Sequence, residues 1–372
     1  MDIKSVDKNF DTSFIVPEDL EWRSVHEHPF SVHGVTYSEE EGLYRRLPKD
    51  IADATNEGVA ILSTNTAGGR IRFMTDSPYI VVRVEEPFVS PFSHMTLAGQ
   101  CGISLFVNNA FAGSMMPSYD QIVAGDVARG GSGKIIFDGI KYPYGTGGEL
   151  YQVEIFLPLY NAVNSVHIGL KKGCALQESR PYKHTNPVLF YGSSITQGGC
   201  ASKPGDDYVN MLCRTLDTDI WNLGFSGSAK AESVMAEYLA AQNPSIFVLD
   251  YDHNAPDAAH LEKTHFYLYE TVRKAHPTTP IVMMTMPTIA GYETREWYQP
   301  RREEILNSFA KAKDLGDNNV YLVDCYGCFG ESAKGECGTV DDCHPNSLGF
   351  MRMAERVYPV LDALLNGGKE CR

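Results

Sequence analysis

The chain has 372 residues, of which 43% are hydrophobic and 21% charged, and it contains no low-complexity tract. That composition excludes intrinsic disorder, and at roughly 100–200 residues per domain the length predicts about two domains. Acidic residues outnumber basic residues by 47 to 32, which gives a formal net charge of −15. A surface of that charge repels nucleic acids and anionic membranes but accepts a neutral small molecule or oligosaccharide.

Residues 1–16 alternate polar and apolar side chains and contain no continuous apolar core. We therefore expect no secretory signal, and no stretch approaches the roughly 20 apolar residues that span a bilayer. A cytoplasmic protein is predicted. Its nine cysteines are then expected to be reduced thiols, because the cytosol keeps thiols reduced.

The first half of the chain predicts an all-β domain over residues 1–180. Short runs rich in β-branched and aromatic residues alternate there with Gly, Pro and Asn turns, which is typical of a sandwich or jelly roll. The runs are Arg70–Met74, Tyr79–Val84, Ser104–Val107, Ala110–Phe111, Glu149–Leu157 and Ser165–Leu170.

The second half, residues 186–372, predicts an α/β domain. Strand-like runs alternate with amphipathic helical stretches, which indicates a parallel sheet covered by helices. The expected strands are Val188–Tyr191, Asp219–Leu223, Ser245–Asp250, Ile281–Met286 and Val320–Asp324, and the expected helices include Tyr208–Leu216, Glu303–Leu315 and Ser347–Leu365. Residues 175–186, which contain Pro181 and end directly before Pro187, form the expected linker. Chemistry in such a sheet lies at the carboxyl ends of the strands.

Two Gly-rich turns follow the first two expected strands. Residues 192–199 read Gly-Ser-Ser-Ile-Thr-Gln-Gly-Gly. Such a turn can expose the Ser194 hydroxyl beside free backbone N–H groups. The alternative is a flexible loop or a helix cap. Residues 222–230 contain Gly227, whose N–H can approach a substrate without a side chain in the way, unless the segment is an ordinary loop.

Two further polar segments follow later strands. Asn254 comes just after the expected third strand, and its amide could donate to a developing negative charge or form a turn before Pro256. Asp341 lies three residues before His344, so its carboxylate can hold the imidazole through one nitrogen and leave the other as a base. The alternative is a capping Asp beside a solvent-exposed His.

Together the four segments resemble the four blocks of the SGNH (GDSL-type) hydrolases, over the C-terminal half of the chain. The matching segments are Gly192–Ile195, Asn222–Gly227, Asn254 and Asp341–His344. Ser193 stands where the family has Asp, and Asp252–Ala255 stands where it has Gly-x-Asn-Asp. The resemblance implies a flavodoxin-like three-layer parallel-sheet domain. The order of a β-domain followed by an SGNH domain is similar to that of family 2 carbohydrate esterases.

The resemblance also implies a mechanism that needs no metal and no organic cofactor. Ser194 attacks an ester carbonyl, His344 transfers its proton, and Asp341 orients the imidazole. The backbone N–H groups of Ser194 and Gly227 and the amide of Asn254 hold the oxyanion.

The expected substrate is an acetylated sugar or oligosaccharide, because no long apolar segment suits a lipid interface. Trp297 and Tyr298 are expected to stack on a sugar face, or else to pack against the neighbouring domain, and Gln197 is a third expected contact. The acyl-chain preference, the acylated position, the sugar and the oligomeric state stay open.

Three alternatives remain. The first is a general short-chain esterase, lipase or thioesterase of the same family, and the second is a non-catalytic carbohydrate-binding protein. The third is a zinc hydrolase that uses Cys325, Cys328, Cys337 and Cys343. Only the first pair of these cysteines has the spacing of a zinc knuckle, so we expect scattered thiols instead.

Overall fold

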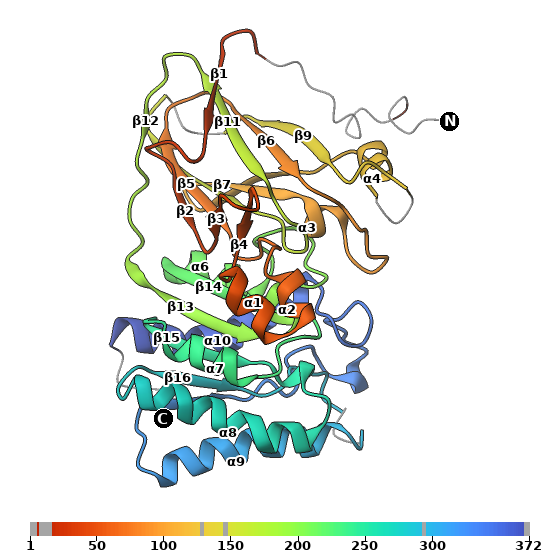
Figure 1. Cartoon of the computed structure of the whole chain (residues 1–372), viewed down its shortest axis with the longest axis vertical. Helices are drawn as coiled ribbons and strands as arrows, with labels where there is room; N and C mark the ends of the chain where they lie inside the picture. The colour runs from red at the N-terminus through yellow and green to blue at the C-terminus, as the bar shows by residue number, and fades with distance from the viewer. Residues whose placement is uncertain (1–5, 7–16, 127–129, 144–147, 292–294, 368–372) are drawn as a thin grey trace.

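The structure is a computed structural model that describes residues 6, 17–126, 130–143, 148–291 and 295–367. Figure 1 shows a β-rich region from the first half of the chain above an α/β region from the second half. The N-terminal segment in which we expect no signal lies outside the described residues, except for Val6. No helix within the described ranges is long and apolar enough to cross a bilayer.

Two large antiparallel sheets build most of the β-rich region, beside a separate two-stranded sheet formed by β3 and β4. One has the strand order β1-β11-β6-β9, and the other has the order β12-β5-β10-β7-β8 with β2 also paired to β5. The strands are β1 (Leu20–Ser24), β2 (Ser31–His33), β3 (Thr36–Ser38), β4 (Leu43–Arg45), β5 (Arg70–Thr75), β6 (Ile80–Glu86), β7 (Ile103–Val107), β8 (Ala110–Met115), β9 (Ile135–Lys141), β10 (Tyr151–Phe156), β11 (Ser165–Lys171) and β12 (Leu176–Gln177).

The two sheets face each other across one core. Alternate residues of each strand point inward, so Val82 and Ile168 of one sheet join Phe73 and Val153 of the other in a single buried cluster. This arrangement is the expected sandwich. The helices that accompany it are α1 (Lys49–Thr55), α2 (Glu57–Leu62), α3 (Leu97–Cys101) and α4 (Tyr119–Gly125).

A parallel sheet forms the centre of the second region, in the strand order β14-β13-β15-β16-β17. Its strands are β13 (His184–Gly192), β14 (Thr218–Gly224), β15 (Ile246–Asp250), β16 (Ile281–Met284) and β17 (Val320–Val323). The helices are α5 (Ser194–Gln197), α6 (Tyr208–Leu216), α7 (Ser233–Ala240), α8 (Ala258–Ala275), α9 (Tyr298–Asp314) and α10 (Ser347–Asn366).

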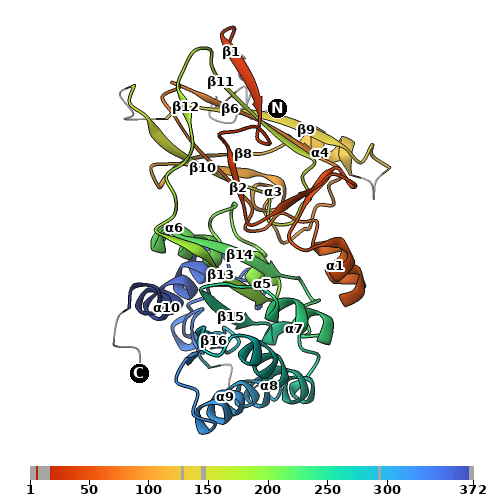
Figure 2. The ribbon, with the colours of Figure 1, turned by 60° about the vertical axis from the view of Figure 1, so that its left-hand side comes forward.

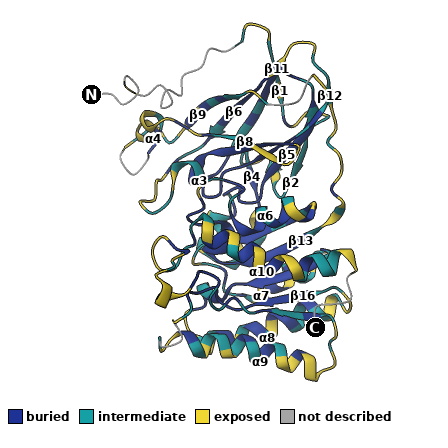
Figure 3. Cartoon of the chain, turned by 180° about the vertical axis from the view of Figure 1, so that it is seen from behind, coloured by how far each residue is buried: buried dark blue, intermediate teal, exposed yellow. Residues whose placement is uncertain are grey.

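Helices cover both faces of this sheet, as Figure 2 shows. Val188 and Phe190 of β13 pack with α6 and α10 on one face. Leu189 and Tyr191 of the same strand pack with α7, α8 and α9 on the other. The strands read as continuous apolar runs because both faces are buried, and Figure 3 shows the exposed residues on the outer sides of the helices. This is the expected three-layer architecture.

The register of the sheet aligns the carboxyl ends of three strands. Gly192 at the end of β13 pairs with Gly224 of β14 on one side and with Asp250 of β15 on the other. The chain passes from β13 to β14 and then returns to the far side of β13, so β13 is the topological switch point where open α/β sheets bind ligands.

The expected linker is shorter in the structure. Leu176 and Gln177 extend the sheet of the β-rich region by pairing with Thr75 and Met74, and β13 already begins at His184. Pro181 and Pro187 are compatible with extended backbone at strand ends, which the sequence pattern did not separate from a linker.

Candidate active site

Ser194 is the first residue of α5, immediately beyond the end of β13. Ser193 is the N-cap of that helix, and its hydroxyl accepts a hydrogen bond from the backbone N–H of Ile195 at 3.1 Å. The N–H of Ser193 donates to the carbonyl of Asp250 at 3.2 Å. These bonds fix the turn between strand and helix. Ser193, which stands where the family has Asp, therefore serves as a cap, and Ser194 beside it is buried, with 7% of the residue exposed.

His344 lies in the loop between β17 and α10 and connects Ser194 to Asp341. Its Nε2 is 3.0 Å from Ser194 Oγ, and its Nδ1 is 2.8 Å from Asp341 Oδ2. An ionised carboxylate only accepts hydrogen bonds, so Nδ1 carries the ring proton and Nε2 is left to accept from the serine hydroxyl. The three residues thus lie in the geometry that a serine nucleophile and its base require.

Asp341 holds the loop as well as the imidazole. Its Oδ1 accepts the backbone N–H groups of His344 at 2.7 Å and of Cys343 at 3.2 Å. Partial burial would raise the pKa of Asp341, but these bonds and the His344 ring outweigh it and hold the pKa below its ordinary value. The neighbouring Asp342 turns away and pairs with Arg295 at 2.8 Å.

Asn254 and Gly227 lie side by side at the ends of β15 and β14. The Gly227 N–H donates to Asn254 Oδ1 at 3.1 Å, and Asn254 Nδ2 donates to the carbonyl of Phe225 at 2.6 Å. These two bonds determine which way the amide points. The second hydrogen of Nδ2 remains for an oxyanion, as does the Ser194 N–H in the first turn of α5, whereas the Gly227 N–H would have to be shared.

Arg301 of α9 anchors the Asn254 turn despite its departure from the family pattern. Its guanidinium donates to the carbonyls of Asp252 at 3.1 Å, Ala255 at 2.7 Å and Pro256 at 2.8 Å. A lone Arg some 46 positions from Ala255 forms no local pattern, so the sequence does not predict this contact.

Arg46 anchors the Gly227 loop from the β-rich half of the chain. It lies between β4 and α1, and its buried guanidinium donates to the carbonyls of Asn222 at 3.0 Å and Gly224 at 2.5 Å. It also binds the carbonyls of Asn65 and Leu62 in its own region. Burial lowers the pKa of Arg46 to about 9. Sequence spacing carries no signal for this contact between distant segments.

Tyr160 reaches the nucleophile from the segment that follows β10. Its hydroxyl donates to the backbone carbonyl of Ser194 at 3.0 Å. Phe92 packs edge-on against Tyr160, and the ring of the nearby His94 lies 5.4 Å from that of His344. The β-rich region thus contributes side chains to the surroundings of Ser194, which the sequence analysis did not assign.

Two of the three expected substrate contacts are corrected by the structure. Gln197 is fully buried, and its amide binds Asn65, Leu159 and the N–H of Ser226. Tyr298 is also fully buried, at the start of α9. Both side chains stabilise the fold and present nothing to a ligand, because a run of polar or aromatic residues does not reveal which member faces inward. Trp297 differs, since 47% of its surface is exposed.

The four cysteines weighed as a zinc site do not gather into one. Cys325 and Cys328 are buried next to each other, Cys337 is exposed beside Thr339, and Cys343 lies 3.8 Å from His253 Nδ1. Within the described ranges, the metal-compatible group of His, Cys, Asp and Glu side chains is a different one.

Two cavities bear on ligand binding. The larger, of about 590 Å³, lies along the outer edge of β14 and is lined by none of the expected site residues. A second, of about 260 Å³, adjoins the His344 loop and is lined by residues that include Asp341, Cys343, Trp297 and Met286. Neither cavity is lined by Ser194 or His344, but the second lies next to the pair, because Asp341 and Cys343 belong to the His344 loop.

Comparison with known families agrees with this geometry. Residues 185–362 match the GDSL-like lipase/acylhydrolase family, and residues 20–176 match the N-terminus of SGNH-hydrolase-type esterases. A comparison with curated protein sequences gave no match.

Three solved structures are similar over most of the chain. A protein from Bacteroides ovatus described as a GDSL-like lipase is 26% identical, with a TM-score of 0.79 over 93% of this chain and 98% of its own. The salicylyl-acyltransferase SsfX3 from a tetracycline biosynthetic pathway is 19% identical, with a TM-score of 0.71 over 94% and 98%. A family two carbohydrate esterase from Clostridium thermocellum, in complex with cellohexaose, is 14% identical, with a TM-score of 0.58 over 81% and 94%.

The second and third of these similarities show a shared fold, and they include the expected likeness to family 2 carbohydrate esterases. Residues 185–362 therefore belong to the GDSL-like lipase/acylhydrolase family, and the chain joins this SGNH-type hydrolase region to the N-terminal region of SGNH-type esterases.

Proposed function

We propose that this protein is a serine esterase that removes acetyl groups from sugars or oligosaccharides. The observation that carries the proposal is the hydrogen-bonded series from Ser194 Oγ to His344 Nε2 at 3.0 Å and from His344 Nδ1 to Asp341 at 2.8 Å. Membership of the hydrolase family supports esterase chemistry, and the fold shared with a carbohydrate esterase is compatible with a sugar substrate.

In the proposed reaction Ser194 Oγ attacks the ester carbonyl carbon while His344 Nε2 takes the hydroxyl proton. The tetrahedral intermediate then expels the sugar alkoxide, which receives that proton from Nε2. Water attacks the acyl-enzyme in the same way, with His344 again as base, and acetate leaves. Asp341 keeps the proton on Nδ1 and stabilises the imidazolium in each half-reaction.

The oxyanion of each intermediate faces the Ser194 N–H and the free hydrogen of Asn254 Nδ2, with Gly227 as a shared donor. Arg46 and Arg301 are positioning residues in this proposal, because they bind the carbonyls of the Gly227 and Asn254 loops. Removal of one preorganised donor typically costs roughly 2.7–4 kcal/mol of transition-state stabilisation.

The small volume of the cavity beside the His344 loop supports a short acyl group. The cavity of about 260 Å³ beside the His344 loop is lined by Asp341 and Cys343 of that loop, and its apolar members are Met286, Pro287 and Trp297. A long acyl chain would gain roughly 0.8 kcal/mol for each buried methylene. The apolar part of this cavity is too small to bury many methylenes. The exposed indole of Trp297 in the same cavity offers a face on which a sugar ring can stack.

Chromogenic esters of increasing acyl length test the acyl preference. We expect kcat/KM to be highest for acetyl and to fall toward octanoyl, and we expect acetate release from an acetylated oligosaccharide. A rate that rises toward octanoyl, with no acetate released from the oligosaccharide, would leave only the general esterase. Absence of turnover and of labelling by a serine-reactive phosphonate would favour the non-catalytic carbohydrate-binding alternative.

Trp297→Ala tests the sugar contact. We expect a higher KM for the acetylated oligosaccharide and little change for a chromogenic acetate, whose leaving group is not a sugar. Tyr267→Ala is the matched control, because Tyr267 is an aromatic residue of similar exposure on α8. Equal effects of the two variants on the oligosaccharide would contradict a role of Trp297 in binding.

A further inference from the structure

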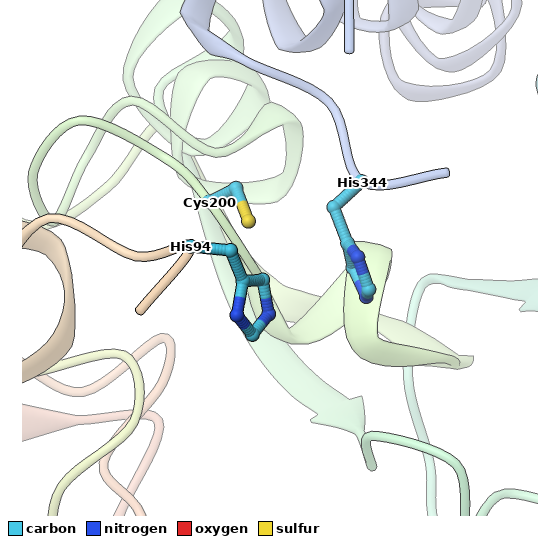
Figure 4. A group of neighbouring side chains, drawn as sticks. All are labelled: His94, Cys200 and His344. Carbon is cyan, nitrogen blue, oxygen red and sulfur yellow. The ribbon is translucent and has the colours of Figure 1, made fainter. Parts of the chain in front are cut away.

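Three potential metal ligands meet beside the nucleophile. His94 comes from the segment between β6 and α3, Cys200 follows α5, and His344 precedes α10. One ligand atom from each residue lies within 4.8 Å of the other two. Figure 4 shows the three side chains gathered around one space. They come from distant parts of the chain, so no sequence spacing predicts the group.

The local backbone brings Cys200 close to the histidine ring. Gly199 separates Cys200 from α5, and a Cβ on Gly199 would lie 3.2 Å from His344 Cδ2. Cys200 itself has a φ of +70°, a conformation that residues with a side chain rarely adopt. Gly198 and Gly199, the two residues between α5 and Cys200, therefore place no side chain between the thiol and the imidazole.

Two imidazoles and one thiolate suit zinc. Bond lengths of about 2.0–2.1 Å to nitrogen and 2.3 Å to sulfur place the ligands of a tetrahedral zinc roughly 3.3–3.6 Å apart, so ligand atoms that now lie up to 4.8 Å apart need to approach by up to about 1.5 Å. His94 lies in a loop and is only partly buried, which leaves it free to make that adjustment. Solvent can fill the fourth position. Mg²⁺ and Ca²⁺ prefer oxygen ligands and do not suit the group.

Zinc in this position would disable His344. Its Nδ1 binds Asp341, and its Nε2 binds Ser194. Coordination through either nitrogen replaces one of these two hydrogen bonds. We propose that His94, Cys200 and His344 form an inhibitory zinc site, in which the bound metal withdraws the base from Ser194 and removal of the metal returns it. The site itself is independent of the proposed function, whereas its inhibitory effect rests on it.

Inhibition of the whole chain by added zinc tests the effect. Protein treated with EDTA and then freed of it is assayed with a chromogenic acetate while Zn²⁺ is titrated, with Mg²⁺ as the control ion. We expect zinc to inhibit and excess EDTA to restore the rate. His94→Ala and Cys200→Ser should keep esterase activity and need roughly 10–100-fold more zinc for the same inhibition, since losing even an outer-shell partner costs that much affinity. Unchanged zinc sensitivity in both variants, or no inhibition of the wild type, would overturn the proposal.

Cobalt binding tests the site without reference to activity. Co²⁺ bound to a thiolate gives a sulfur-to-metal charge-transfer absorption band. We expect this band in the wild type, its loss in Cys200→Ser and weaker binding in His94→Ala. A chain that shows the band but hydrolyses no ester would keep the metal site and refute the proposed function. A chain that hydrolyses esters but shows no band, or shows the same band in Cys200→Ser, would refute the metal site.

Discussion

Asp341→Asn is the sharpest test of the triad, because the structure determines how the new amide must lie. Asp341 Oδ1 accepts two backbone N–H groups, from His344 at 2.7 Å and Cys343 at 3.2 Å. An NH₂ group in that position would face two donors, so the asparagine oxygen stays there and its NH₂ faces His344 Nδ1. Nδ1 then has to accept, and the ring proton moves to Nε2. A protonated Nε2 cannot take the proton of Ser194.

The size of the loss follows from this change of tautomer. The same substitution in a Ser-His-Asp protease lowers kcat by roughly 10⁴-fold, which is about 5.4 kcal/mol at 1.36 kcal/mol per factor of ten. The fold should tolerate it. The Asp341 side chain is 35% exposed, and the amide keeps both backbone hydrogen bonds, so we expect the free energy of unfolding to change by less than about 1 kcal/mol.

Steady-state hydrolysis of a chromogenic acetate and urea unfolding measure the two quantities. Asp342→Asn is the matched control, because Asp342 is the adjacent carboxylate and pairs with Arg295 at 2.8 Å away from the imidazole. We expect that variant to stay within about threefold of wild type, since an exposed ion pair contributes little. If Asp341→Asn kept a tenth of wild-type activity, or if Asp342→Asn lost as much, our assignment of the imidazole's partner would be wrong.

Four further outcomes are expected. Ser194→Ala should abolish turnover and phosphonate labelling, whereas Ser193→Ala should lose only a helix cap, about 1 kcal/mol of stability; the reverse pattern would identify the other hydroxyl as the nucleophile. Asn254→Ala should lower kcat by roughly 10²–10³-fold with little change in KM, and a kcat within threefold of wild type would exclude its amide from the oxyanion hole. Arg46→Leu should lower the free energy of unfolding by roughly 2–4 kcal/mol, because it leaves buried carbonyls without a donor, as thermal or urea unfolding would show. Burial raises the pKa of Asp250 from 3.8 to about 7, so between these two pH values the folded state keeps a proton that the unfolded chain releases. The free energy of unfolding should therefore decline as the pH rises from about 4 to about 7. Asp250→Asn should flatten part of that decline in urea unfolding at several pH values, and an unchanged pH dependence would show that Asp250 does not contribute to it.

The elements that the sequence predicted well are those with a strong local pattern. The central strands contain apolar runs that are buried on both faces, such as Val188–Tyr191 and Ile246–Leu249, and α6 has the bounds that its amphipathic spacing predicts, Tyr208–Leu216. The short strands β1 to β4 and the helices α1 and α2 were not predicted. Their residues are only half-buried or belong to short segments. Neither the helical nor the strand periodicity of apolar residues therefore repeats often enough to be recognised.

The same distinction between residues with and without a local sequence pattern applies to the candidate site. Ser194, Gly227, Asn254, Asp341 and His344 each follow a strand or precede a helix in the order that the motif blocks require. Their positions along the chain were therefore visible in the sequence, although their roles await the tests above. Gln197 and Tyr298 were expected at the surface and are buried, because a motif identifies a loop without saying which of its side chains face the interior.

By itself the sequence determined the class of each half of the chain and the residues that form the proposed nucleophile, base and carboxylate. These properties depend on local periodicity and on short spacings, such as the three residues from Asp341 to His344. Only the tertiary structure decided what supports and surrounds them. Arg46 meets Gly224 across 178 positions and Tyr160 meets Ser194 across 34, and His94 meets His344 only because the β-rich region lies against the α/β region. Such contacts form when distant segments pack together to bury apolar surface, and no spacing within one segment encodes them.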